Sequence, residues 1–396
     1  MHVDPVEKID SMKKYIKITL FALASILLVF MILHIGWRFK DRQTLNVYIL
    51  DKTVTQLDRP EHKSLVWALN YNRFVKPNGK AYSNKSDYYG FFPIDIATEA
   101  FDFKSIRINE VEEYAEKYDV AYYADCYGVQ SFEWYKGKTK PVRSQKVYGG
   151  LNQNDYLLLK SMLEKDKLVI GEYNMFSTPT NALVRIKTEE LLDINWKGWS
   201  GKYFSSLNVN APDGPPHWMK NLYESQHLGV WPNSKQGIVF LNNDGLIEVL
   251  AIDEHLTQGF PVIISSDEAV QRFEVANQIV YENWFEVIEP GGNKVLSHFK
   301  LHLTPEGEEK LKRIGISNTF PAIIEGKNNG KMFYFCANFA ENPAHMWTSK
   351  IAGGKTINHF LTRFGTTNRA KFFKHYYHPL IKNILKEYAE HTDIAE

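Results

Sequence analysis

The chain has 396 residues, with 47 lysines and arginines against 46 aspartates and glutamates, and a formal net charge of +1 at pH 7. This balance argues against the strongly basic surface that binds nucleic acid, so we expect no nucleic-acid partner. Two cysteines with no CxxC or HExxH motif make no metal framework, and we expect neither a metal site nor a cofactor.

An uninterrupted apolar run, ITLFALASILLVFMILHIG at residues 18–36, is the strongest signal in the sequence. A helix rises about 1.5 Å per residue, so this run crosses the roughly 30 Å hydrocarbon core of a bilayer. Basic residues and a tryptophan flank it as interfacial anchors: Lys13, Lys14, Lys17, Trp37, Arg38 and Lys40. We therefore predict a short tail over residues 1–17, a transmembrane helix over 18–37, and the lipid bilayer as its partner.

A cleaved signal peptide is the alternative interpretation of this run. Signal peptides have apolar regions of about 7–15 residues followed by a small-residue cleavage site, and residues 36–40 (GWRFK) fit that pattern poorly. The basic residues on the two sides are nearly equal in number, so orientation follows from the short tail being the easier segment to leave inside. We expect a single-pass membrane protein with its N-terminus in the cytoplasm and its large domain on the outer or periplasmic side.

The segment after the apolar run alternates short buried strands with amphipathic helices. In chain order the strands are 45–50, 119–124 and 167–171, and the helices are 60–69, 109–117, 152–165 and 178–192. Asn152 is a plausible N-cap of its helix. Such alternation favours a parallel sheet of βα units.

A stretch rich in Trp, Gly and Pro, residues 196–232, is long for a loop and suggests an insertion or a ligand-carrying segment. Beyond it the pattern changes to successive strands, which suggests an antiparallel region. We expect these strands at 237–241, 245–250, 260–265, 278–288 and 295–303. A helix capped by Thr304, strands at 322–325 and 332–337, and a closing helix at 368–391 broken at Pro379 complete the chain.

The predicted fold class is α/β: an N-terminal transmembrane helix followed by a mostly parallel, flavodoxin-like sheet with an inserted or appended antiparallel β region. The predicted domains are an α/β domain over residues 45–345, with the insertion at 196–232, and a helical extension over 346–396.

Four stretches in this order look familiar: 147–150 (VYGG) before a helix containing Asp155, 167–171 (KLVIG), 320–322 (FPA) with a following glycine, and 333–335 (FYF). Together they resemble class I glutamine-amidotransferase-like domains over about residues 45–340, including the degenerate versions found in carbohydrate-handling proteins. The resemblance implies a flavodoxin-like sheet with a site at the carboxyl ends of its strands. Working amidotransferases place a nucleophilic cysteine on the turn after the strand matching 167–171. This chain has Glu172, Tyr173 and Asn174 there, so glutamine hydrolysis by that route should be absent.

Polar residues just past buried parallel strands are the natural site candidates, because those strand ends meet at one edge. Asp125 and Glu172 are the candidate catalytic pair, since two facing carboxylates about 5–9 Å apart can act as acid and base in glycoside hydrolysis. The competing interpretation is that each caps a turn or pairs with a nearby cation. The candidate ligand-binding residues are Asp51, Lys52, Asp87, Tyr88, Asn174, Trp199 and Asn338.

The composition and the strand-end residues leave three functions open. The first is a membrane-anchored, non-amidotransferase protein of the cell envelope that binds a ligand, with carbohydrate suggested by an aromatic content of 14 %. The second is a glycoside hydrolase that uses Asp125 and Glu172. The third is a structural subunit of a membrane complex. We interpret Cys126 and Cys336 as two small residues buried on strands, with a disulfide between them as the alternative if the domain lies in an oxidising compartment. The sequence does not indicate any partner protein.

Overall fold

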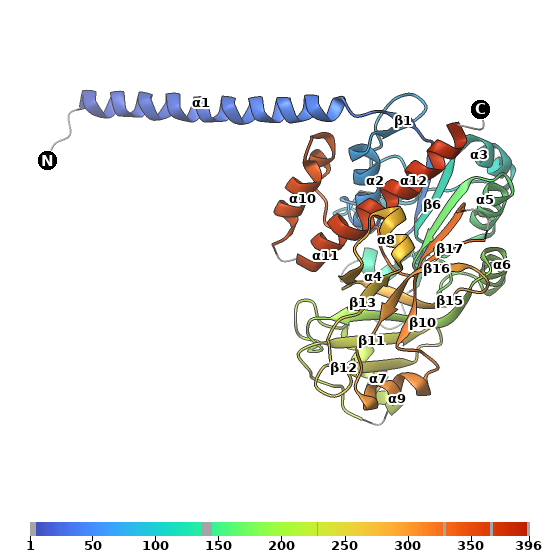
Figure 1. Cartoon of the computed structure of the whole chain (residues 1–396). Coiled ribbons are helices and arrows are strands. Elements are labelled where there is room, and N and C mark those ends of the chain that lie inside the picture. Colours follow the sequence, from blue (N-terminus) through green and yellow to red (C-terminus); the bar gives the residue numbers. More distant parts are fainter. Residues whose placement is uncertain (1–4, 136–144, 228, 328–329, 365–366, 394–396) are drawn as a thin grey trace.

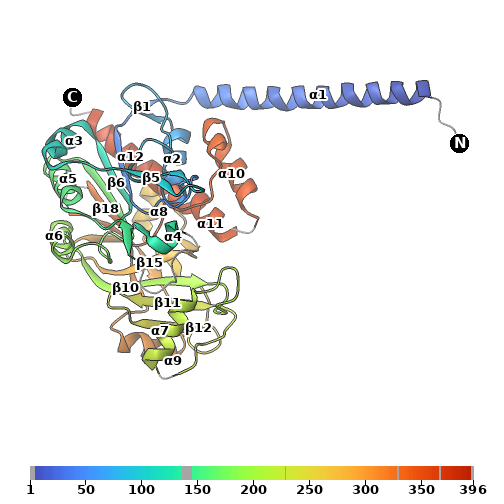
Figure 2. The same cartoon turned by 180° about the vertical axis from the view of Figure 1, so that it is seen from behind.

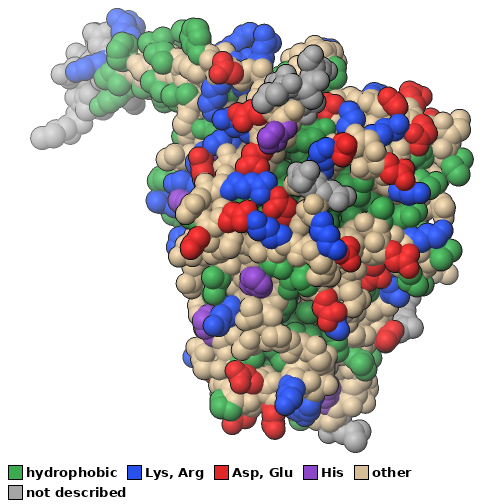
Figure 3. All heavy atoms as spheres, turned by 45° about the vertical axis from the view of Figure 1, so that its right-hand side comes forward, with side chains coloured by type: hydrophobic (Ala, Val, Ile, Leu, Met, Phe, Trp, Pro, Cys, Tyr) green, Lys and Arg blue, Asp and Glu red, His purple; other side chains and the backbone are tan. Residues whose placement is uncertain are grey.

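The structure is a computed structural model that describes residues 5–135, 145–227, 229–327, 330–364 and 367–393. Helix α1 (Pro5–Arg38) projects from a large body (Figure 1). Its part Met12–Arg38 is long and apolar enough to cross a membrane, and none of its most apolar segment is buried against the body. A signal sequence can have the same properties. Hydrophobic side chains cover the projecting part of α1, whereas charged side chains of both signs are spread over the body (Figure 3).

A ten-stranded sheet in the order β14-β13-β16-β17-β18-β9-β6-β2-β4-β5 forms the centre of the body. Strands β18, β9, β6, β2 and β4 pair in parallel, and the strands on either side of them are antiparallel. The strands are β2 (Val47–Asp51), β4 (Tyr89–Asp95), β5 (Ala100–Lys104), β6 (Val120–Asp125), β9 (Leu168–Glu172), β13 (Val262–Ser265), β14 (Gln278–Val280), β16 (Lys294–Lys300), β17 (Thr319–Glu325) and β18 (Met332–Phe335).

The mixed character of this sheet corrects the expectation of a mostly parallel, flavodoxin-like one. The parallel strands are where the sequence predicted them, and β2, β6 and β9 are buried along their whole length, as strands covered on both faces must be. The strands expected as an antiparallel region divide between two sheets. Strands β13, β14, β16 and β17 extend the large sheet, because β17 pairs with β18 and β18 pairs with β9.

A second, antiparallel sheet has the order β12-β11-β10-β15. It consists of β10 (Asn195–Phe204), β11 (Gly237–Asn242), β12 (Ile247–Ala251) and β15 (Trp284–Glu289). The stretch 196–232 is therefore not one long loop: its start lies in β10, and α7 (His217–His227) follows. Two short pairs, β1 (Gln43–Thr44) with β3 (Phe74–Val75) and β7 (Val129–Gln130) with β8 (Lys146–Tyr148), complete the strands described.

Strand β15 fastens the second sheet to the carboxyl end of β18. Phe285 bridges Ala337, and the N–H of Glu286 donates to the carbonyl of Cys336 at 2.9 Å. The second sheet therefore stands beside the carboxyl edge of the parallel strands, below that edge in both cartoon views (Figures 1 and 2).

Helices cover the two faces of the large sheet, with α3 (Val111–Lys117), α5 (Gln153–Glu164) and α6 (Ala182–Leu192) on one flank and α2 (Pro60–Tyr71), α8 (Asp267–Phe273) and α12 (His378–Asp393) on the other (Figures 1 and 2). The remaining helical segments are η1 (Ile108–Glu110), α4 (Ser131–Trp134), α9 (Pro305–Arg313), η2 (Met346–Lys350), α10 (Gly354–Thr362), α11 (Thr367–Phe372) and η3 (Phe373–Tyr377).

Local sequence signals explain several helix ends. Asn152 accepts hydrogen bonds from two N–H groups at the start of α5, and Thr304 accepts one at the start of α9, so both predicted caps are confirmed. At the predicted break or kink at Pro379 the helix instead continues: η3, a π-helical turn, precedes α12, and α12 runs through the proline. Because proline has no N–H, the carbonyl of His375 is free to accept from the N–H of Ala276, at 3.0 Å.

Candidate functional site

The carboxyl ends of β2, β6 and β9 bring three predicted acids to one edge of the sheet. Asp51 is the last residue of β2 and lies beside Asp125, the last residue of β6, in the strand register. Glu172 ends β9, the next strand in the sheet. The parallel arrangement that the sequence predicted for these three strands therefore places the acids as expected.

Asp125 lies at the centre of this edge and receives hydrogen bonds from all three strand ends. Its Oδ1 accepts from the N–H of Tyr127 at 2.8 Å and from Nδ2 of Asn174 at 3.4 Å, and the hydroxyl of Thr53 also bonds to it. Burial, partly offset by the Tyr127 N–H and reinforced by the negative charge of Asp51, raises the pKa of Asp125 to about 7. Asp125 therefore changes charge near neutral pH, which few carboxyl groups do.

Asn174 holds a strained backbone conformation on the turn after β9. Its φ is +70°, a left-handed value that costs energy for residues other than glycine. Its Oδ1 accepts from the hydroxyl of Ser177 at 3.0 Å while its Nδ2 reaches Asp125. These two hydrogen bonds hold the amide toward the end of β6.

Asp51 is paired with His62, a residue of α2 that the sequence did not single out. Nδ1 of His62 lies 2.5 Å from Oδ2 of Asp51, and Nε2 lies 2.8 Å from the carbonyl of Asn84. Both ring nitrogens therefore face acceptor oxygens, which holds the ring in one orientation. Tyr88 packs on the same ring with centroids 4.5 Å apart, so this predicted ligand-binding residue supports His62 and is itself buried.

Glu172 is fully buried, at 0 % exposure, and both of its carboxyl oxygens are engaged. The hydroxyl of Tyr122 donates to Oε1, and the N–H of Ala340 donates to Oε2 at 3.1 Å. Burial raises the pKa of Glu172 well above its usual range, and these two hydrogen bonds lower it. The side chain joins β6, β9 and the segment after β18, and it has no surface to offer a substrate.

Two further buried acids at this edge escaped the sequence analysis. Burial raises the pKa of Glu286 on β15 to about 8, although hydrogen bonds from Tyr334 and the backbone of Asn174 lower it, so Glu286 is protonated at neutral pH.

Glu61, in the first turn of α2, has one buried oxygen without a partner in the described part of the chain. Burial and the charge of Asp51 raise its pKa well above the usual range. Glu286 interrupts an apolar strand, which is a usable sequence signal; Glu61 resembles an ordinary helix-start acid.

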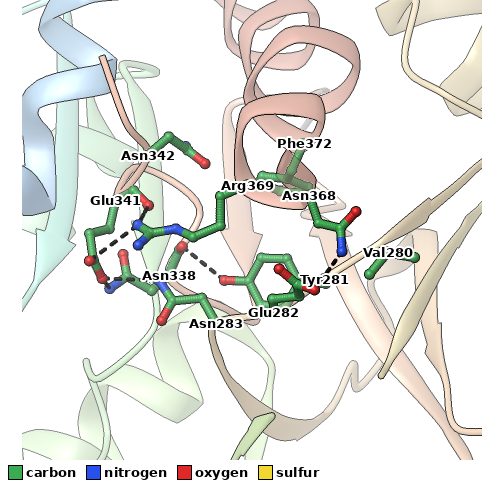
Figure 4. A pocket seen from close by; sticks show the side chains of 10 residues that line it. All are labelled: Val280, Tyr281, Glu282, Asn283, Asn338, Glu341, Asn342, Asn368, Arg369 and Phe372. Atoms are coloured by element: carbon green, nitrogen blue, oxygen red, sulfur yellow. Dashed lines mark hydrogen bonds and ion pairs between the residues drawn. The ribbon is translucent and has the colours of Figure 1, made fainter. Parts of the chain in front are cut away.

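Asn338 belongs to a small polar hollow beside this edge (Figure 4). Its Nδ2 donates to Oε2 of Glu341 at 2.8 Å, Nδ2 of Asn283 donates to the same oxygen at 3.0 Å, and Arg369 of α11 pairs with Oε1 at 3.2 Å. The Oδ1 of Asn338 is buried and has no partner among the described residues. The cavity volume of this hollow is about 10 Å³, room for about one water molecule and far less than the roughly 300–1,000 Å³ of pockets for drug-sized ligands.

Three predicted ligand-binding residues lie away from this edge or point elsewhere. Lys52 is buried and bonds to Asp155 and the carbonyl of Gly150. Asp87 pairs with Lys76 at 2.7 Å, and Trp199 is buried within β10 rather than in a loop. Each of these side chains has a structural partner that the sequence order could not reveal.

The two cysteines, Cys126 and Cys336, are free and buried. Burial raises the pKa of both thiols well above the usual range, so neither is a thiolate nucleophile. Within the residues that the structure describes, no group of three or more His, Cys, Asp or Glu side chains has an arrangement that can hold a metal ion.

Comparison with known proteins adds little to this geometry. No protein-family model matches the chain, and no curated protein does so either. Among solved structures, a putative ThuA-like protein from Bacteroides uniformis is similar, with 11 % sequence identity, covering 86 % of this chain and 92 % of that chain, at a TM-score of 0.31. ThuA-like proteins have a class I glutamine-amidotransferase-like fold, the type that the sequence resembles, but similarity this low carries no argument about the site.

Proposed function

We propose that the chain is a membrane-anchored ligand-binding protein whose site is the carboxyl edge of β2, β6 and β9, and that its ligand is rich in hydroxyl groups, as a glycan is. The observation that carries the proposal is the convergence of Thr53, Asp125 and Asn174 from three different strand ends. A carboxyl group with a pKa near 7 both donates and accepts hydrogen bonds, which suits hydroxyl groups that do the same.

Aromatic rings beside these polar groups support a carbohydrate as the ligand class. Tyr173 directly precedes Asn174 and stacks with Trp284 at a ring-centroid distance of 6.2 Å. Tyr127, two residues after Asp125, is half-buried. Flat apolar rings next to a few directed polar groups are the usual composition of a small-molecule site.

The membrane part of the proposal rests on α1. We propose that α1 remains as an uncleaved anchor, with the N-terminus in the cytoplasm and the body on the outer or periplasmic side. A thiol-reactive, membrane-impermeant probe applied to intact cells tests the orientation through Val230→Cys, a highly exposed position on the body, because both native cysteines are buried. Labelling without lysis supports an outer body; labelling only after lysis places the body inside.

The binding test uses the full chain in lipid nanodiscs against a panel of envelope glycans. Asp125→Asn should weaken binding at least tenfold, because Asn has no charge to change and presents an amide in place of one oxygen. Glu190→Gln, an exposed change on α6, should leave binding unchanged. The proposal fails if no glycan binds the wild type, which favours the structural-subunit function, or if Asp125→Asn binds as tightly as the wild type.

A glycoside hydrolase is the second candidate, and the pKa of Asp125 favours it. A group that titrates near 7 suits a general acid or base at neutral pH. Glu172 gives no support as its partner, since its oxygens are fully engaged. Glycan cleavage by the wild type that is lost in Asp125→Asn would make the protein an enzyme; binding without products keeps it a binding protein.

A further inference from the structure

Helix α1 meets the body inside its own apolar run, not beyond it. The N–H of Ala352 donates to the carbonyl of Leu33 at 2.9 Å, and Nδ1 of His34 lies 2.8 Å from the carbonyl of Lys350. The rings of Phe30 and Trp347 contact each other at 5.5 Å. Phe30 precedes the end of the run at residue 36 by about 9 Å of helix rise. If α1 spans a bilayer, the segment around η2 therefore lies at the depth where hydrocarbon gives way to headgroups.

The surface next to this junction is apolar and exposed. Helix α10 lies beside the last third of α1 in both cartoon views (Figures 1 and 2). Four large side chains of η2, α10 and the residues after it are exposed to between 41 % and 72 %: Trp347, Phe360, Leu361 and Phe364. Arg363 stacks over the rings of Phe360 and Phe364. Water-exposed rings under a guanidinium group are typical of side chains at a membrane interface.

Lysines gather near this junction: Lys40 lies two residues beyond α1 with its Nζ 3.2 Å from the carbonyl of Tyr71, Lys355 lies on α10 and Lys374 lies on η3. Burial, followed by the positive charges of Lys382 and Lys355, lowers the pKa of Lys40 to about 8. Burial, followed by the positive charges of Lys374 and Lys382, also lowers the pKa of Lys355. Glu274 pairs with Lys382 at 3.1 Å and offsets one of these charges. Mutually repelling ammonium groups beside a membrane helix are complementary to anionic headgroups.

We propose that η2, α10 and the residues up to Phe364 form a second membrane contact, in which the four apolar side chains enter the interface and the lysine cluster (Lys40, Lys355, Lys374 and Lys382) binds anionic lipid. This inference rests on the membrane-anchoring role proposed for α1. The second contact would hold the body against the bilayer at two points instead of one. It would therefore determine which face of the body is oriented toward the lipid.

Depth measurement on the full chain tests this contact. Phe364→Cys, labelled with an environment-sensitive fluorophore, is reconstituted into vesicles of 70 % phosphatidylcholine and 30 % phosphatidylglycerol that carry lipid-bound quenchers. Val230→Cys is the matched control, because it is similarly exposed but lies near α7 and the second sheet. Lipid quenching at position 364 should exceed that at 230 at least threefold. Equal quenching overturns the proposal.

Two further arms separate the ways in which the proposal can fail. Flotation of the protein with vesicles after carbonate washing reports on α1, so equal quenching with normal flotation rejects the second contact alone, whereas loss of flotation rejects the anchor. In Phe364→Cys, adding Lys355→Glu and Lys374→Glu should reduce quenching in the anionic vesicles and change it little in pure phosphatidylcholine. A protected label that persists in detergent and depends on protein concentration identifies a second copy of the chain as the occupant and overturns the proposal.

Discussion

Nζ of Lys52 and Oδ2 of Asp155 lie 2.5 Å apart, and both side chains are 2 % exposed. The pair joins the end of β2 to the first turn of α5, where Asp155 also accepts from the N–H of Asn152. Burial lowers the pKa of Lys52, and the charge of Asp155 raises it enough that the net shift is upward. Lys52 was predicted to bind a ligand; the structure gives it this internal partner.

Removing the carboxylate of this pair should leave a buried charge without compensation. We expect Asp155→Asn to lower the free energy of unfolding by about 3–5 kcal/mol, measured by urea denaturation of the full chain in detergent. Adding Lys52→Met should recover most of that loss, since the charge is then gone. Glu164→Gln, which breaks the exposed Lys160–Glu164 pair on the same helix, should cost less than about 0.5 kcal/mol. A double variant no more stable than Asp155→Asn would contradict this account.

Glu172 should contribute to stability. Glu172→Ala leaves a cavity and removes the acceptor for the N–H of Ala340 and the hydroxyl of Tyr122. We expect it to lower the free energy of unfolding by about 2–4 kcal/mol, while Glu190→Ala on the surface of α6 changes it by less than about 0.5 kcal/mol. Urea denaturation of the two variants side by side decides the point. An unaltered midpoint for Glu172→Ala would show that Glu172 does not hold these elements together.

Stability should fall as the pH rises toward 8. The pKa values of Asp125 and Glu286 are about 7 and about 8 in the folded chain, above the ordinary values of about 4 for unfolded carboxyl groups. Between those limits the folded state holds protons that the unfolded state has released, so raising the pH favours unfolding. Each group contributes a slope of up to about 1.4 kcal/mol per pH unit.

Glu286→Gln isolates one of these contributions, because glutamine stays neutral at every pH. Unfolding free energy measured from pH 5 to 8 should decline less steeply in Glu286→Gln than in the wild type. Glu289→Gln, on the same strand, should keep the wild-type slope, because a hydrogen bond from Lys197 lowers the pKa of Glu289 below this window. Identical slopes in all three proteins would show that Glu286 is ionised in the folded state.

The junction between α1 and η2 should be visible in hydrogen exchange. An added Cβ at Gly36 would already meet the Cβ of Ala352 at 3.4 Å, so the larger Gly36→Leu side chain should wedge the helix from the body. We expect the N–H of Ala352 to exchange at least tenfold faster in Gly36→Leu, measured by mass spectrometry in nanodiscs. Ala24→Leu, on the exposed part of the same helix, should have no effect there.

The parallel centre of the fold was predictable because its signals are local. Residues 45–50, 119–124 and 167–171 are short apolar runs closed by an acid or followed by one, and they became β2, β6 and β9 with boundaries shifted by one or two residues. The helices between these runs predict parallel strands, whose carboxyl ends share one edge of the sheet, so Asp51, Asp125 and Glu172 were correctly expected at that edge. The antiparallel strands were recognised as strands, but nothing local showed which of them extend the large sheet and which form the second one.

The roles of the edge residues were less predictable, since they depend on partners distant in sequence. Glu172 bonds to the N–H of Ala340, 168 residues away, and Asn338 reaches a hollow that includes Arg369 of α11. His62 lies in an amphipathic helix, where a histidine attracts no notice until the fold places it against Asp51. Periodicity predicts which face of an element is buried; it does not predict what that face meets.

The contact between His34 and Lys350 joins residues 316 positions apart in the sequence. At roughly 5–20 residues per second of synthesis, the partner of α1 leaves the ribosome about 15–60 s after α1 itself. If α1 is the anchor proposed above, it enters the bilayer during that interval, before its partner on the body has been made. The junction between α1 and η2 therefore forms late in synthesis, and a chain truncated before residue 346 would keep the whole of α1 but could never form it.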